Sequence, residues 1–212
     1  MGKISQGILG GLSGKVGNVI GASWKGIDYL RIKPSSVANP RTPGQVNQRN
    51  KFTASLEFLQ PNKDFINVGY KSFAIKKTAF NAAMSEILGT AITGTAPNFT
   101  VDYANALLSK GTLAGVLNPT ASYATAGQVN FNWTDNSTGI NANSTDRSML
   151  LVYNPIKNES VMFLNSAERE EGMAVLAIPS TYAGDTLHTY MAFISLDGKV
   201  SNSSYLGSGT AA

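Results

Sequence analysis

The sequence predicts a mainly β fold: a β-sandwich at the C-terminal end, a small α-helical segment in the middle and an extended arm at the N-terminal end. In residues 112–212, short apolar segments alternate with turn residues at the spacing of a sandwich. Residues 42–111 carry apolar side chains at helical spacing. Residues 1–41 keep neither period, because eight glycines interrupt the apolar positions before Ile27. These observations divide the chain into three segments, 1–41, 42–111 and 112–212.

The N-terminal arm is too rich in glycine to hold a fixed shape by itself. Glycine loses more backbone entropy on ordering than any other residue, so contacts from outside the arm have to fix its conformation. Only residues 23–31 alternate well enough to predict a strand, with Ile27, Tyr29 and Arg31 on one face and Trp24 set apart. We therefore expect the arm to become ordered against another molecule.

The middle segment is predicted to contain two helices. The first begins at residues 42–45, where a threonine can cap, a proline suits the first turn and a glutamine completes a capping box, and it stops before Pro61. The second spans about residues 76–88 and ends at Gly89. Residues 62–75 fit a strand or a helix equally well.

The last hundred residues predict short strands joined by turns. Val129, Phe131 and Trp133 alternate with amides, so Trp133 is expected in the core. Asp197-Gly198 is a strong hairpin turn. Residues 89–97 are predicted as a linker and residues 207–212 as a loose end. Predicted strands cover residues 99–103, 128–133, 149–153, 161–164, 173–178, 187–196 and 200–206.

Charge is distributed unevenly along the chain, although the formal net charge is only +4. Residues 1–50 carry seven Lys and Arg against one Asp, whereas residues 119–212 carry four against eight acidic residues. Charged residues make up just 14% of the chain, and Asn, Ser, Thr and Gly take their place, as is typical of β-rich surfaces and of surfaces that pack against other subunits. A basic N-terminal segment and an acidic C-terminal segment favour head-to-tail packing of copies, although each exposed ion pair contributes little binding free energy.

Composition excludes several classes of site. The chain has no cysteine, which excludes disulfides and thiolate metal sites. No apolar run approaches the roughly eighteen residues of a membrane span. Lys15 and repeated glycines interrupt any secretion signal at the N-terminus. We expect no cofactor and no membrane span.

The residues that enzymes use are scarce here. Residues 10–16 suggest a phosphate-binding loop, but the first glycine is misplaced and Val16 stands where a Ser or Thr would hold magnesium. His188 is the only histidine, and its position within a strand favours a packing role. Residues 168–171 are expected to form a solvated acidic turn. The sequence therefore predicts a protein that is not an enzyme.

A dispersed basic series with two aromatic residues, Trp24 and Tyr29, runs through the first fifty residues. Such a series can lie on nucleic acid through phosphate contacts and base stacking. Alternatively, the basic residues can pair with the acidic sandwich of a neighbouring copy. We favour this second interpretation, because arms that package nucleic acid usually carry denser runs of Lys and Arg. The basic residues are Lys3, Lys15, Lys25, Arg31, Lys33, Arg41 and Arg49.

The C-terminal segment resembles a fibronectin type III or immunoglobulin-like sandwich. The resemblance rests on Trp133, Pro179, the segment 189–193 and the hairpin 197–201. It implies a fold and hardly any function, since such sandwiches serve many unrelated roles.

The whole chain also resembles an uncharacterised family associated with bacteria and prophages. Three motifs carry this resemblance: GKVGN at residues 14–18, SWKGIDY at residues 23–29 and PRTPGQ at residues 40–45. The resemblance implies no activity, but its phage association favours a structural role in a virion.

Three functions follow as hypotheses. The first is a self-assembling structural protein of a phage-like virion, made in the bacterial cytoplasm, whose partners are other copies of itself and further virion proteins. The second is an immunoglobulin-like module whose loops, such as residues 135–146, bind a carbohydrate or a protein. The third is nucleic-acid binding through the basic arm. The residues expected at inter-subunit contacts are Trp24, Ile27, Tyr29, Leu30, Arg31, Arg41 and Arg49.

Overall fold

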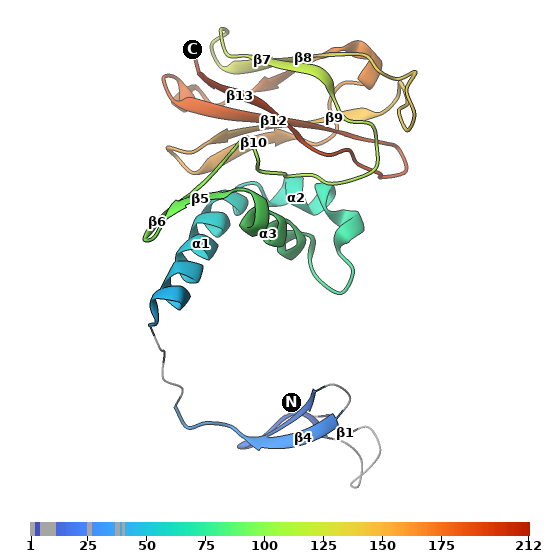
Figure 1. Cartoon of the computed structure of the whole chain (residues 1–212). Coiled ribbons are helices and arrows are strands. Elements are labelled where there is room, and N and C mark those ends of the chain that lie inside the picture. The colour runs from blue at the N-terminus through green and yellow to red at the C-terminus, as the bar shows by residue number, and fades with distance from the viewer. Residues whose placement is uncertain (1–2, 5–11, 25–26, 37–38, 40) are drawn as a thin grey trace. The chain divides into compact units, whose positions relative to one another are not determined.

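The computed structural model describes residues 3–4, 12–24, 27–36, 39 and 41–212. The chain divides into two compact units, Met1–Thr42 and Pro43–Ala212, and each is described by itself. Figure 1 shows the strands and helices of both units in chain order. Among the helices of the described residues, none is both long and apolar enough to cross a membrane.

Two antiparallel sheets form the predicted sandwich in the second unit (Figure 1). One sheet has the strand order β10-β9-β12-β13 and the other has the order β11-β8-β7. The mainly β fold class with a sandwich is therefore confirmed. The strands are β7 (Leu117–Ser122), β8 (Gln128–Thr134), β9 (Arg147–Asn154), β10 (Glu159–Phe163), β11 (Met173–Ala177), β12 (Thr186–Ile194) and β13 (Ser204–Thr210).

The core between the two sheets follows the alternation of β8. Val129, Phe131 and Trp133 are buried, and the amides between them lie on the opposite face. The Trp133 ring packs edge-on against Phe193, with 5.8 Å between ring centroids. The core position predicted for Trp133 is confirmed.

A helical layer covers the outer face of the β10-β9-β12-β13 sheet (Figure 1). In β9, Met149 and Leu151 pack against the helices, whereas Leu150 and Val152 pack against the second sheet. Because β9 is buried on both faces, its sequence is a continuous apolar run without alternation. The layer consists of α1 (Pro43–Leu59), α2 (Lys63–Gly69), a short 3-10 helix (Lys71–Phe73), α3 (Ala79–Thr90) and the hairpin of β5 (Ile92–Thr95) and β6 (Asn98–Val101).

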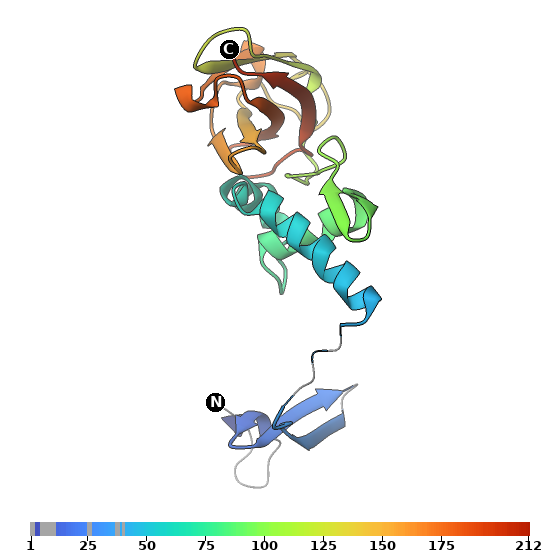
Figure 2. The same ribbon diagram turned by 90° about the vertical axis from the view of Figure 1, so that its left-hand side faces the viewer.

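The helical segment and the sandwich share one hydrophobic core. Phe58 and Leu59 of α1 and Ile87 of α3 belong to the same buried cluster as Tyr153 and Tyr190 of the sandwich. Both segments accordingly lie within the single compact unit Pro43–Ala212. Figures 1 and 2 show the first turns of α1 projecting beyond the rest of this unit.

The helix boundaries agree with the sequence in part. α1 begins and ends as predicted, and one of its apolar side chains, Phe52, is 47% exposed. α3 begins at Ala79 rather than near residue 76, because the Thr78 hydroxyl accepts a hydrogen bond from the Asn81 amide and caps it there. The predicted stop at Gly89 is wrong, since the helix continues to Thr90.

Three further predictions in the second unit are corrected. Residues 89–97 are not a linker, because β5 pairs with β6 there. The strand β7 has no counterpart among the predicted strands. The tail is not loose, since Thr186 pairs with Thr210 and Ala211 is buried.

The first unit contains an antiparallel sheet with the strand order β1-β2-β3-β4. The prediction of one strand over residues 23–31 is wrong, because two strands meet there and residues 25–26 between them lie outside the described residues. An extended arm is therefore replaced by a meander of paired strands. These are β1 (Lys3–Ile4), β2 (Leu12–Val16), β3 (Val19–Trp24) and β4 (Ile27–Ile32).

Candidate interaction surface

The strand β4 carries four of the seven residues predicted at inter-subunit contacts, Ile27, Tyr29, Leu30 and Arg31. All six residues of β4 are exposed, and Ile27, Tyr29 and Leu30 are 65%, 44% and 63% exposed. Among the described strands, β4 pairs only with β3, so its outer edge offers unpaired backbone groups.

The pairing register places apolar side chains on both faces of this sheet. On one face, three residues lie side by side on neighbouring strands: Val16 of β2, Val19 of β3 and Ile32 of β4. Leu30, two residues before Ile32 on β4, lies on the same face. We call these four residues the aliphatic face, and they are 37–78% exposed. The other face carries a row of Lys15, Ile20 and Arg31 beside Ile27 and Tyr29, and we call it the aromatic-basic face.

The remaining predicted contact residues lie elsewhere. The backbone of Trp24 ends β3 opposite Ile27, while its side chain lies outside the described part of the chain. Arg41 is exposed and follows the sheet in the first unit. Arg49 is an exposed residue of α1 in the second unit.

A two-residue turn at Gly17-Asn18 joins β2 to β3. Gly17 has a φ of +57°, which the first central position of a type II′ hairpin turn requires. The Lys33 amide also donates a hydrogen bond of 2.7 Å to the Asn18 carbonyl, which extends the pairing of β4. Gly-Asn between Val16 and Val19 is a hairpin signal that could have revealed these strands in the sequence.

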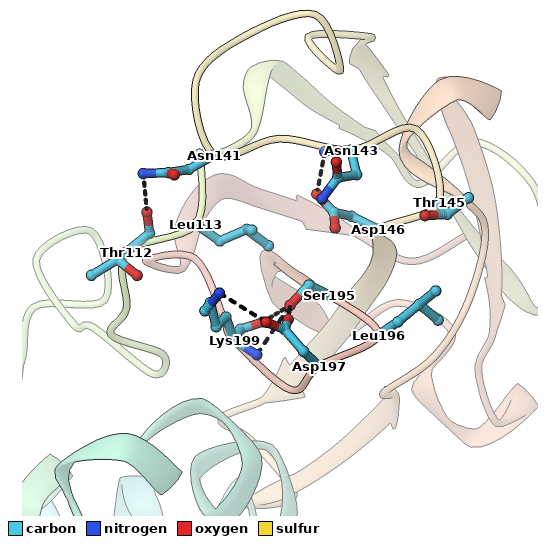
Figure 3. Close-up of a pocket in the computed structure, with 10 residues that line it drawn as sticks. All are labelled: Thr112, Leu113, Asn141, Asn143, Thr145, Asp146, Ser195, Leu196, Asp197 and Lys199. Atoms are coloured by element: carbon cyan, nitrogen blue, oxygen red, sulfur yellow. Dashed lines mark hydrogen bonds and ion pairs between the residues drawn. The ribbon is translucent and has the colours of Figure 1, made fainter.

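A polar cavity of about 320 Å³ lies at one end of the sandwich (Figure 3). The loop that carries Asn141, Asn143 and Asp146 lines one side, and the β12–β13 hairpin with Asp197 and Lys199 lines the other. This loop belongs to the segment 135–146 that the sequence predicts for ligand contacts.

A buried ion pair fixes the loops around this cavity. Arg169 is fully buried, and its guanidinium lies 3.0 Å from the Asp146 carboxylate and donates to the Ala114 carbonyl and the Asn136 side chain. It also lies 3.8 Å from the centroid of the Phe193 ring. The prediction that residues 168–171 form a solvated turn is therefore wrong for Arg169. Its buried side chain contacts three separate loops.

The hairpin side of the cavity carries a paired charge. Asp197 Oδ2 lies 2.8 Å from Lys199 Nζ, and the Ser195 hydroxyl donates a hydrogen bond to the same carboxylate. The bonds from Lys199 and Ser195 lower the pKa of Asp197 to about 2. The cavity therefore presents a carboxylate, an ammonium group and several amides, which can bind hydroxyl groups.

His188 has a packing role, as its position in a strand predicts. Its ring lies between Tyr103, 4.0 Å away by centroids, and Tyr205, whose hydroxyl is 2.8 Å from Nδ1. Burial lowers the pKa of His188. Among the described residues, no group of three or more His, Cys, Asp or Glu side chains is placed to hold a metal ion.

Comparison with known proteins gives a family. Residues 11–207 match the family described as "Family of unknown function (DUF6266)". The chain belongs to this family. The expectation of an uncharacterised family is thus confirmed, and its association with bacteria and prophages stays a prediction.

No curated protein matches the chain. Among solved structures, the chain is similar to the fn3 domain of the human collagen alpha-1(XX) chain, with 14% sequence identity and a TM-score of 0.35. The similarity covers 49% of this chain and 91% of that domain.

Proposed function

We propose that the chain is a self-assembling structural protein of a phage-like virion, and that its first unit makes contacts between subunits. The observation that carries this proposal is the sheet β2-β3-β4, which exposes apolar side chains on both faces. A globular antiparallel sheet normally packs one face on a core and turns the other to water. Two apolar faces suit a sheet that lies between neighbouring subunits.

The energetics favour docking of this sheet. A few strands without a packed face are marginally stable in water. Burying an aliphatic side chain stabilises by about 1.5–3 kcal/mol, and the aliphatic face alone offers Val16, Val19, Leu30 and Ile32. Docking onto another copy therefore supplies the stabilisation that the sheet lacks by itself.

The charge distribution supports contacts between unlike ends of the copies. Residues 1–50 carry an excess of basic residues, and residues 119–212 carry an excess of acidic ones. A basic first unit is attracted to the acidic sandwich of a neighbour. The resemblance to a prophage-associated family supports placement in a virion, after synthesis in the bacterial cytoplasm, and the protein has no catalytic role in this proposal.

Size-exclusion chromatography with light scattering tests the proposal. The full chain is expected to form assemblies, and a variant that lacks residues 1–33 is expected to be a folded monomer. Within the full chain, Leu30→Asp should reduce the assembled mass, whereas Ile140→Asp, at a side chain 91% exposed in the second unit, should not. Ordered particles or tubes of the truncated protein in electron microscopy would show the proposal to be wrong.

The polar cavity favours a second candidate, an immunoglobulin-like module that binds a carbohydrate or a protein. Asn143, Asp197 and Lys199 supply the donors and acceptors that hydroxyl groups require. Binding of the full chain to a glycan array, with loss of binding in Lys199→Ala, would support this function. If no glycan binds, carbohydrate recognition by this cavity is contradicted.

The aromatic-basic face favours a third candidate, nucleic-acid binding as a secondary property. Lys15 and Arg31 lie in one row beside Tyr29, which suits phosphate contact and base stacking. Binding to single-stranded DNA should then weaken steeply with salt and fall in Tyr29→Ala. Binding that does not depend on salt would exclude phosphate contact.

A further inference from the structure

The outer edge of β11 is an unprotected edge of the sandwich. β11 ends the β11-β8-β7 sheet, and within residues 41–212 no strand pairs with its other side. Natural proteins protect such edges with lysine, proline or a β-bulge. The sequence of β11, MAVLA, contains neither charge nor proline, and its pairing with β8 shows no register shift. This edge is therefore open to a strand from another molecule.

The side chains of β11 specify the partner strand. Met173 and Val175 are 57% and 45% exposed on the outer face. Glu170 and Glu171, both exposed, come just before the strand. A complementary strand has to present apolar side chains along its length and positive charge at the end beside these glutamates.

The strand β4 has these properties. Ile27 and Tyr29 are exposed apolar residues, and Arg31 and Lys33 supply positive charge at its C-terminal end. Antiparallel pairing brings that end beside Glu170 and Glu171, at the N-terminal end of β11. Parallel pairing would place the charges at opposite ends, and parallel pairs are also rarer.

We propose that β4 of one copy adds antiparallel to the outer edge of β11 of the next copy, with Tyr29 opposite Met173 and Ile27 opposite Val175. This inference rests on the proposed function and names the place where the first unit of one copy binds the next copy. Arg31 then lies opposite Glu171, and the aromatic and aliphatic pairs contribute across the strands.

The contact joins two different surfaces, so every copy has a donor strand and an acceptor edge. Such a heterologous contact continues from copy to copy, so it forms a ring where the rotation between copies closes and a filament where it does not. The same pairing is the kind of strand addition that structural proteins use to link subunits.

Disulfide crosslinking between two single-cysteine variants tests the pairing. The chain has no cysteine, so Tyr29→Cys and Met173→Cys each introduce the only thiol. Mixed and oxidised, with one variant carrying a size tag, they should form the mixed disulfide, because directly opposed Cα atoms lie within disulfide range. The matched control, Thr120→Cys on β7 at the far edge of the same sheet, should give none with Tyr29→Cys.

Each other outcome overturns the inference. A Tyr29→Cys homodimer would mean pairing between two β4 strands, and a Met173→Cys homodimer would mean pairing between two β11 strands. Assembly without the mixed disulfide would overturn the inference and leave the proposed function standing. A full chain that is monomeric by light scattering would overturn both.

A charge exchange gives an independent readout. In the proposed register Arg31 lies opposite Glu171, whose side chain makes no ion pair among the described residues and accepts a hydrogen bond from the Glu168 amide. Glu171→Lys should weaken assembly by up to about fivefold, the limit for an exposed pair. Combining it with Arg31→Glu should restore assembly, because opposite charges again face each other at this position. Failure of the double variant to recover would contradict the antiparallel orientation.

Discussion

Arg169 shows how one buried side chain can organise several loops. Its guanidinium pairs with Asp146, and its backbone carbonyl accepts a hydrogen bond of 2.7 Å from the Trp133 indole. Both charges are excluded from water, so each depends on the other for compensation. The loops that line the polar cavity therefore depend on this pair.

Arg169→Ala should destabilise the second unit by about 3–5 kcal/mol, because Asp146 would remain buried without a partner charge. Urea unfolding measures the difference. The control is Lys199→Ala, which removes an exposed ion pair and should leave the free energy of unfolding nearly unchanged. Equal effects of the two variants would contradict the structural role of Arg169.

His188 predicts a pH dependence of stability. Burial lowers the pKa of His188, so the unfolded chain binds its proton at a higher pH than the folded chain does. Its contribution to stability is complete above the unfolded pKa of about 6.5 and is lost as the pH falls through the folded pKa.

The free energy of unfolding should therefore be lower at pH 5 than at pH 7.5, and His188→Gln should remove most of that difference. Urea titrations of the monomeric chain at the two pH values provide the measurement. No other histidine is present, and the lowered pKa values of Asp102, Asp185 and Asp197 affect stability only in more acidic solution. An unchanged pH dependence in His188→Gln would contradict the half-buried position of the ring.

At the scale of elements, the register of the β2–β3 hairpin determines which side chains lie on each face of the first sheet. Gly17 adopts a φ of +57°, and a Cβ added there would meet no atom within 4 Å. A side chain at this position is therefore opposed by backbone strain and not by crowding.

Gly17→Ala should weaken assembly by about 5–30-fold, the equivalent of the 1–2 kcal/mol that a left-handed conformation costs an L-residue. Dilution monitored by light scattering gives the dissociation midpoint. The control is Gly115→Ala, where a Cβ also meets open space and φ is not positive, and it should assemble normally. A Gly17→Ala protein that assembles as well would mean that the hairpin does not contribute to the contact.

The sandwich could be predicted from the sequence because its signals are local. The alternation of β8 and the Asp197-Gly198 turn lie within a few residues, and the structure contains both. Burial of Arg169 could not be predicted, because its partners Asp146 and Ala114 are distant in the sequence. Within the candidate surface, the sequence indicated Ile27, Tyr29 and Leu30, but the meander was missed because glycine obscured its period.

At the scale of the whole molecule, the chain combines a well-packed body with a sheet whose described residues contribute to neither buried hydrophobic cluster. The second unit buries two hydrophobic clusters, whereas every residue of β4 in the first unit is exposed. In the proposed assembly this contrast separates stability from association: the body folds by itself, and the sheet provides the connection between copies. Variants in the two units should accordingly affect different properties, unfolding in one case and association in the other.

Backbone hydrogen exchange measured at high and low protein concentration tests the central claim most directly. If β3 and β4 gain their order from a neighbouring copy, their amides should be protected in the assembled protein and should exchange rapidly once light scattering shows a monomer. The amides of β9 and β12 should remain protected at both concentrations. Equal protection of β3 and β4 in the isolated monomer would contradict the account.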